Sequence, residues 1–360
     1  MGITTVVLDG EEEHLGCHDP SNIWKINGYY YVQTGNKTVL ESYGNAEESP
    51  EKYKGDWTEL YRSNDLKNWE YLHRFYDSTK NLESHPDIGE DAACPCILPL
   101  FDAKENGNNT GKYIQLFISH LRGCQYYIGE IKDEKFYPEK YGRMSWNDKT
   151  YFAPEGLVDD KNRCIFWTWL HNNPEPIDDV KKFGWTGVFG FPRVIWLNGE
   201  ELNMAPAEEL DRLMYNYQSF EKIREIPVKN GESFRIKAEF NSTADSKTGL
   251  RVREDEKEDE YTDIYVDFEN NTLTVDATKS GRYGEKIKEE APFLLKENEK
   301  LKLDIFVDKS VVEVYANERQ AICRRVYPTN PEKAVKVKVI GNTESIEKLE
   351  AWEIFPSNMY

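Results

Sequence analysis

The chain has 360 residues, 39% of them hydrophobic, which is enough for two ordinary domains that each bury a core. Its 65 Asp and Glu residues outnumber 46 Lys and Arg, and the formal net charge of −19 repels phosphate backbones and anionic lipid headgroups. We therefore expect no nucleic-acid partner and no membrane-surface partner.

The N-terminal sequence MGITTVVLDGEEEHLG contains neither a basic n-region nor a long apolar segment. No apolar run approaches the roughly 20 residues that a membrane-spanning helix needs. These features predict a cytoplasmic protein. The six cysteines are scattered and the six histidines lack metal-ligand spacing, so we expect no disulfide framework, no metal site and no cofactor.

Short β-rich runs bounded by turn signals fill the first two-thirds of the chain. Asn27-Gly28 separates residues 23–26 from residues 29–32 and is typical of a β-hairpin. The acidic segment Met204–Leu213 has a helical composition and is predicted to lead into a connector. Further strands are predicted at 113–119, 126–131, 164–170 and 194–197.

After about residue 222 the strands become more regular. Residues 234–240 and 301–307 alternate apolar with polar side chains, which indicates one buried face and one wet face. Turn residues at 270–271 and 279–281 favour an antiparallel sandwich. The charged block Glu254–Glu260 is predicted to be a solvated loop.

These patterns predict an all-β protein in two parts. The first domain is expected at residues 1–205 and a connector at 206–222. The β-sandwich domain is expected at 223–360.

Several short motifs follow one another in a characteristic order: YFAP (151–154), GWTG (184–187), FPRV (191–194), LDIFVDKSVVEVYAN (303–317) and RRVYP (324–328). Together they resemble glycoside hydrolase family 32, whose members cleave fructans or sucrose. The resemblance implies a shortened β-propeller of five-bladed lineage followed by a C-terminal β-sandwich, and a small carbohydrate as substrate.

The family's catalytic carboxylates lie in three motifs, of which this chain keeps fragments. Family members carry an Asp nucleophile in Asn-Asp-Pro-Asn-Gly, a hydroxyl-binding Asp in Arg-Asp-Pro and a general-acid Glu in Glu-Cys-Pro. Here Ala93 precedes Cys94-Pro95, so the position of the general acid holds no carboxyl group. Asp19 matches either the Arg-Asp-Pro aspartate, with the repeats that carry the nucleophile missing, or the nucleophile itself. Both alternatives place Asp19 in the site.

Glu155 stands where the family usually has an amide, so a carboxyl group is expected beside the pocket whose usual acid is lost. Glycoside hydrolysis needs two carboxyl groups that flank one bond, with one of them kept protonated by its surroundings. Asp19 and Glu155 are the predicted pair. Alternatively, Glu155 is only an exposed loop residue. Glu90 and Asp91 are either substitute acids or polar loop residues.

The resemblance also suggests residues that contact the sugar. His18 replaces the family's Arg and could donate a hydrogen bond to a sugar hydroxyl, or it could be structural. The candidates for substrate binding are His18, Trp24, Arg122, Tyr151 and Trp185.

We expect a glycosidase, or a transglycosylating relative, that acts on a β-fructofuranoside or a similar small furanoside. Two alternatives remain: a catalytically inactive carbohydrate-binding protein, and a fragment that works only within an assembly. A partial propeller would expose sheet edges that soluble proteins ordinarily cover, so we also expect a homo-oligomer.

Overall fold

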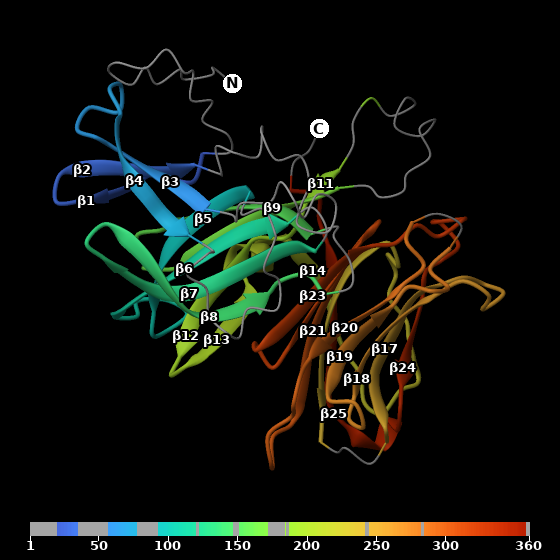
Figure 1. Cartoon of the computed structure of the whole chain (residues 1–360). Helices are drawn as coiled ribbons and strands as arrows, with labels where there is room; N and C mark the ends of the chain where they lie inside the picture. The colour runs from blue at the N-terminus through green and yellow to red at the C-terminus, as the bar shows by residue number, and fades with distance from the viewer. Residues whose placement is uncertain are drawn as a thin grey trace, which may run out of the picture. The chain divides into compact units, whose positions relative to one another are not determined.

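The computed structural model describes residues 20–34, 57–77, 93–119, 122–146, 151–171, 184, 187–241, 245–281 and 284–357. Its contacts divide the chain into two compact units. One unit comprises Met1–Met144 and Phe152–Thr168, and the other comprises Ser145–Tyr151 and Trp169–Tyr360. The fold is all-β, as the sequence predicts, with antiparallel sheets in both units (Figure 1).

The first unit contains two four-stranded antiparallel sheets, with strand orders β1-β2-β3-β4 and β5-β6-β7-β8 (Figure 1). The predicted hairpin is confirmed: Ile26 pairs with Tyr29, and Asn27 and Gly28 both take positive φ, as a two-residue turn requires. The strands are β1 (Trp24–Ile26), β2 (Tyr29–Thr34), β3 (Trp57–Ser63), β4 (Glu70–Asp77), β5 (Ala93–Phe101), β6 (Asn109–Ser119), β7 (Gly123–Lys132) and β8 (Lys135–Arg143).

One hydrophobic cluster joins the facing sides of these two sheets. Aromatic rings dominate it, for example Phe117 and Tyr127, which stack with their centroids 4.9 Å apart. Trp24 packs against Tyr31 and Phe75 at the edge of the same cluster. The abundant aromatic residues of this part of the chain therefore hold neighbouring sheets together.

The hairpin that follows has its strands β9 (Tyr151–Val158) and β10 (Cys164–Leu170) paired with each other. Gly156 lets β9 approach its neighbours closely, because a Cβ there would lie 2.8 Å from both the Ile165 carbonyl oxygen and the Leu98 side chain. In the second unit, Trp169 and Leu170 pair with β11 (Val188–Phe189). Strands β12 (Arg193–Asn198) and β13 (Glu201–Pro206) form the next hairpin.

The predicted helical character of Met204–Leu213 is wrong for its first half. Met204 and Ala205 are buried and pair with Ile195 and Val194, so these residues belong to strand β13. Tertiary pairing overrides the helical composition there. Only Glu208–Leu213 is helical, as a 3₁₀ helix. Residues 214–219, within the predicted connector, form the edge strand β14 (Met214–Ser219), which pairs with β25 (Ile346–Ile354).

The remaining strands form the β-sandwich that the sequence predicts, with two six-stranded antiparallel sheets (Figure 1). The strand orders are β14-β25-β16-β21-β22-β23 and β15-β24-β17-β18-β19-β20. Alternate residues of β16, such as Phe234 and Ile236, are fully buried in the core between the sheets. The other strands of these two sheets are β15 (Glu225–Ile226), β16 (Ser233–Phe240), β17 (Lys247–Glu254), β18 (Thr262–Asp267), β19 (Thr272–Asp276), β20 (Lys288–Pro292), β21 (Leu301–Asp308), β22 (Val311–Ala316), β23 (Gln320–Arg325) and β24 (Lys336–Ile340).

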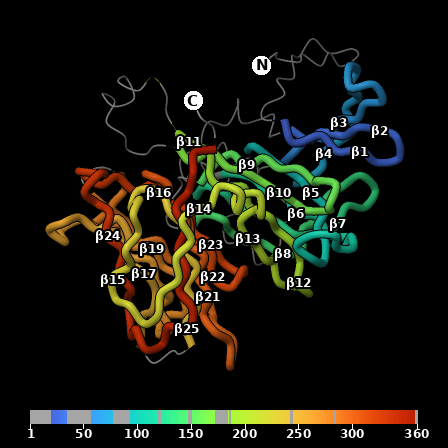
Figure 2. Tube along the Cα trace, turned by 180° about the vertical axis from the view of Figure 1, so that it is seen from behind, coloured from blue at the N-terminus to red at the C-terminus, as the bar shows by residue number. Residues whose placement is uncertain are grey.

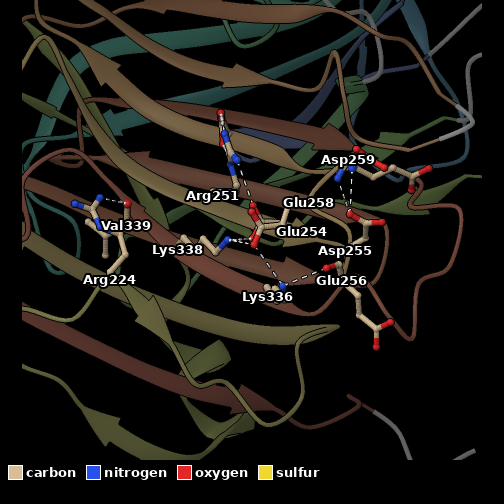
Figure 3. A network of polar contacts seen from close by, with 12 residues as sticks. Arg224, Arg251, Glu254, Asp255, Glu256, Glu258, Asp259, Lys336, Lys338 and Val339 are labelled. Carbon is tan, nitrogen blue, oxygen red and sulfur yellow. Dashed lines mark hydrogen bonds and ion pairs between the residues drawn. The ribbon is translucent and has the colours of Figure 1, made fainter.

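The charged block Glu254–Glu260 is not simply a solvated loop. Glu254 ends strand β17 with a fully buried side chain, and its carboxylate pairs with Lys338 at 2.6 Å and Arg251 at 3.2 Å (Figure 3). Asp255 accepts hydrogen bonds from the backbone of Asp259 and Glu260, which closes the turn. Basic residues of β17 itself and of the neighbouring strand β24 therefore hold the start of a run whose composition predicts a solvated loop. Figure 2 shows β15, β17 and β24 on this side of the sandwich.

Candidate active site

The segment that follows Asp19 lies between strands β2 and β5. The backbone N–H of Ser21 donates to the Gln33 carbonyl at 2.8 Å, and the Gln33 N–H donates to Ser21 Oγ at 3.1 Å. The Asn22 side chain binds both backbone groups of Ile97: Nδ2 donates to the carbonyl at 2.7 Å and Oδ1 accepts from the N–H at 2.8 Å. The Asn22 side chain therefore binds β5 much as the backbone of an edge strand would, and it fixes this segment to β5.

Strand β5 begins at the position where the family resemblance implies a general acid. Ala93 is buried there and pairs with Ile118 of β6, and a β-bulge follows before Cys96. Its methyl group cannot transfer a proton. Any acid that works at this place must come from a neighbouring strand.

Glu155 comes to β5 from the adjacent strand β9. Its negative charge is one of the causes that raise the pKa of the Cys96 thiol, after burial, which is the largest cause. The Gly156 N–H interacts with the Cys96 thiol and with the Glu155 carboxyl group. The two side chains are therefore neighbours, and Cys96 lies three residues beyond Ala93.

The surroundings of Glu155 favour its protonated form. The residue is exposed as a whole, but partial burial of the carboxyl group raises its pKa to about 7, and the Gly156 N–H opposes this only in part. Desolvation disfavours a carboxylate because the charged form loses more hydration than the neutral form. A carboxyl group with such a pKa can act as a general acid near neutral pH.

Strands β5 and β9 share an unusual backbone feature near these residues. Cys94 and Ala153 have φ of 46° and 43°, and each precedes a proline. A positive φ is unfavourable for a residue with a Cβ, and such strain is concentrated at functional sites. In each strand the residue that follows the proline, Cys96 on β5 and Glu155 on β9, comes two positions after the positive φ.

The other predicted site residues have different surroundings. Trp24 packs in the cluster between the first two sheets, and Arg122 is half-buried, with its carbonyl accepting a hydrogen bond from Arg143. Tyr151 is buried, and its ring centre lies 4.8 Å from the Arg193 guanidinium carbon. His18, Asp19, Glu90, Asp91 and Trp185 lie outside the described residues.

Sequence reasoning missed Asn22, Gln33 and Cys96. The side chain of Gln33 is fully buried next to Ser21, and neither its amide nitrogen nor its amide oxygen has a partner among the described residues. A glutamine inside the aromatic run of β2 was the available signal, because buried amides are uncommon without a bonding role. Within the described ranges, no group of three His, Cys, Asp or Glu residues is arranged to hold a metal ion, and no helix is long and apolar enough to cross a bilayer.

Similar proteins carry the names of fructan- and sucrose-cleaving enzymes. Levanase from Bacillus subtilis (strain 168) is 26% identical over 327 residues, which cover 82% of this chain and 46% of levanase. The insoluble isoenzyme 4 of β-fructofuranosidase from Oryza sativa subsp. japonica is 28% identical over 243 residues, 62% of this chain and 39% of that protein. The chain thus spans less than half the length of these relatives.

Solved structures show the same fold. Fructan 1-exohydrolase IIa from Cichorium intybus matches with a TM-score of 0.75 and 18% identity over 94% of this chain and 72% of that chain. Sucrose-6-phosphate hydrolase from Lactobacillus gasseri matches with a TM-score of 0.71 and 19% identity over 96% of this chain and 67% of that chain. These likenesses confirm the expected combination of propeller-type sheets and a β-sandwich.

Two family models divide the chain between them. The N-terminal domain of glycosyl hydrolases family 32 matches residues 4–206, and the C-terminal domain of the same family matches residues 209–353. The predicted limits of 1–205, 206–222 and 223–360 stay a prediction. The resemblance seen in the sequence motifs is confirmed, and the chain belongs to glycosyl hydrolases family 32.

Proposed function

We propose that the protein cleaves the glycosidic bond of a small β-fructofuranoside, or transfers its fructosyl unit, with Asp19 as the essential carboxylate and Glu155 as the general acid. The observation that carries the proposal is the Glu155 carboxyl group, which lies beside Cys96 on strand β5 with its pKa raised to about 7. The names of the similar proteins, levanase and fructan 1-exohydrolase among them, support the substrate class.

In the proposed reaction the Asp19 carboxylate attacks the anomeric carbon of the fructosyl unit. The bond to the leaving oxygen breaks, and Glu155 gives that oxygen its proton. A water molecule, or a sugar hydroxyl in transfer, then attacks the same carbon, Glu155 takes up its proton, and Asp19 is released. This route requires the two carboxyl groups to lie about 5–5.5 Å apart. If Asp19 is the hydroxyl-binding aspartate instead, it orients the sugar and another carboxylate is the nucleophile.

The test is the dependence of the rate on the leaving group. Glu155→Gln removes the proton donor, so turnover of sucrose should fall by about 10²- to 10⁴-fold. An activated aryl fructofuranoside should be largely spared, because its departing oxygen needs no proton. Asp19→Asn should abolish turnover of both substrates. Fructose release and aryl release are the two measurements.

Glu90→Gln and Asp91→Asn are the controls, since the same leaving-group pattern at either would move the acid there. Full activity in both Asp19→Asn and Glu155→Gln would exclude this mechanism. Ala93, at the family's acid position, favours a second function, a catalytically inactive carbohydrate-binding protein. A parent protein that binds fructosides but releases no fructose from sucrose, levan or inulin would establish that alternative.

A further inference from the structure

The hairpin β9–β10, which carries Glu155, has its open end in the second unit. Its first residue is Tyr151 and its last is Leu170. In an antiparallel hairpin the start of the first strand and the end of the second strand lie together. Contacts that hold Tyr151 and Leu170 in place therefore also hold the base of β9, the strand that carries Glu155.

Two buried arginines bind this end of the hairpin. The Arg193 guanidinium carbon lies 4.8 Å from the centre of the Tyr151 ring. Arg325, on sandwich strand β23, donates from Nη1 to the Leu170 carbonyl at 3.4 Å. The Ser145 hydroxyl also donates to the Tyr151 carbonyl, at 3.1 Å.

Arg193 is held in turn by a sandwich carboxylate. Its Nη2 lies 2.7 Å from Oε1 of Glu313 on β22, and both side chains are 0% exposed. The Tyr315 hydroxyl donates to the same oxygen at 2.5 Å. Removing one partner of a buried ion pair is strongly destabilising, so Glu313 helps to determine where Arg193 can lie.

A second buried pair holds the chain just ahead of β9. The Trp146 N–H donates to Glu289 Oε1 at 2.9 Å, and Glu289 Oε2 lies 3.3 Å from Arg324 Nη1. The side chains of Glu289 and Arg324 are almost wholly buried. A sandwich carboxylate thus binds Trp146 directly, and another contacts Tyr151 indirectly through Arg193.

We propose that Glu313 and Glu289 are positioning residues for the reaction: buried sandwich carboxylates that fix the base of the β9–β10 hairpin and thereby keep Glu155 against strand β5. The proposal rests on the proposed function. Its physical basis is that desolvation of Glu155 depends on the close packing of β9, which Gly156 permits. If the hairpin loosens, water reaches Glu155, and the pKa of its carboxyl group falls toward the ordinary value.

The experiment compares Glu313→Gln with Glu254→Gln in the full chain. Both glutamates have fully buried side chains in ion pairs, but Glu313 pairs with Arg193, whereas Glu254 pairs with Arg251 and Lys338 within the other sandwich sheet (Figure 3). Glu289→Gln is the second test variant. Hydrogen exchange of the β9 amides and the pH profile of kcat/KM on sucrose are measured for each variant.

All three variants, Glu313→Gln, Glu289→Gln and Glu254→Gln, should unfold at a lower urea concentration than the parent, because each breaks a buried ion pair. Only Glu313→Gln and Glu289→Gln should speed exchange in β9, by about tenfold, with β5 and β6 unchanged. The same two variants should move the alkaline limb of kcat/KM to lower pH, whereas Glu254→Gln should leave it in place.

Unchanged exchange in β9, or equal acceleration in Glu254→Gln, would overturn the proposal. Faster exchange with an unmoved alkaline limb would also overturn it, because the hairpin would then have loosened without affecting the acid. If Glu313→Gln does not fold, Glu289→Gln decides by the same criteria. A parent without activity refutes the proposed function, and hydrogen exchange then still decides whether the sandwich holds the hairpin.

Discussion

At the scale of single residues, the chemistry of Glu155 is created by its neighbours. Gly156 gives β9 the space to approach β5, and Ala153 takes a backbone conformation that few residues with a Cβ adopt. Either feature taken alone would indicate only a crowded strand. Together they accompany a carboxyl group that is partly desolvated beside Cys96, on the same strand as Ala93.

The raised pKa of Glu155 predicts how stability depends on pH. Its value of about 7 lies above the ordinary 4.5, so between these values the folded chain binds more protons than the unfolded chain. This contribution to stability is present at low pH and is lost as pH rises through about 7. Glutamine does not titrate, so Glu155→Gln should gain stability relative to the parent at about pH 8 compared with about pH 4. Urea unfolding of both proteins at the two pH values checks this.

Glu299 provides a control whose contribution to stability should change with pH in the opposite direction. Its pKa is lowered to about 2, because hydrogen bonds from Arg319 and its other partners outweigh the opposing effect of burial. Its contribution is present above the unfolded pKa and is lost on acidification. Glu299→Gln should therefore lose stability relative to the parent at about pH 8 compared with about pH 4. The same pH trend in both variants would contradict the assignment for Glu155.

At the scale of secondary-structure elements, the candidate site depends on contacts between strands of different sheets. The Asn22 side chain joins the start of the first sheet to β5 through two hydrogen bonds. Asp19 is three residues before Asn22 in the sequence.

Removal of the Asn22 side chain should therefore affect both stability and turnover. Asn22→Ala leaves the N–H and carbonyl of Ile97 without these partners, which should cost about 1–3 kcal/mol. It should also lower kcat/KM on sucrose, because the Asp19 segment is released from β5. Asn270→Ala is the matched control, since Asn270 donates to Asp267 in a sandwich turn. If Asn22→Ala loses stability but has the same kcat/KM as Asn270→Ala, the two hydrogen bonds between Asn22 and Ile97 have no catalytic role.

At the scale of the whole molecule, the sandwich is a scaffold. Its core is a continuous set of buried aliphatic and aromatic side chains from both sheets. Under the proposal above, its contribution to catalysis is indirect and runs through the buried pairs of Glu313 and Glu289. Changes on its exposed faces are expected to spare turnover.

Assembly stays a prediction at this scale. On strand β14, at one edge of the sandwich, Tyr217 is more than half exposed. Phe355, which stacks on Tyr215 of the same strand, is also more than half exposed. Exposed edges of sheets with aromatic side chains are surfaces that proteins commonly cover by association. We expect a homo-oligomer, with a mass by light scattering that is a multiple of 42.1 kDa at micromolar concentration. A monomer under these conditions would contradict the expectation.

Much of the architecture follows from short-range patterns in the sequence. The Asn27-Gly28 turn and the strand Cys164–Leu170 appear in the structure as predicted. The apolar face of residues 234–240 is buried as predicted, but Arg235 on the face expected to be wet is also buried, paired with Asp304. Strand periodicity and turn chemistry depend on a few consecutive residues, so they can be recognised without a partner. The family resemblance is of the same kind, because it rests on short motifs in a fixed order.

What the tertiary structure decided depends on residues far apart in the chain. Arg193 and Glu313 are 120 positions apart, and neither carries a local signal that it is buried or paired. Met204 and Ala205 have a helical composition but become a strand once they pair with β12. The proton affinity of Glu155 arises from desolvation beside β5, more than fifty residues earlier in the chain. Pairing and desolvation exist only when the strands are assembled. For that reason the sequence by itself determined the fold class and family, while only the tertiary structure decided that the Glu155 carboxyl group is desolvated and its pKa raised.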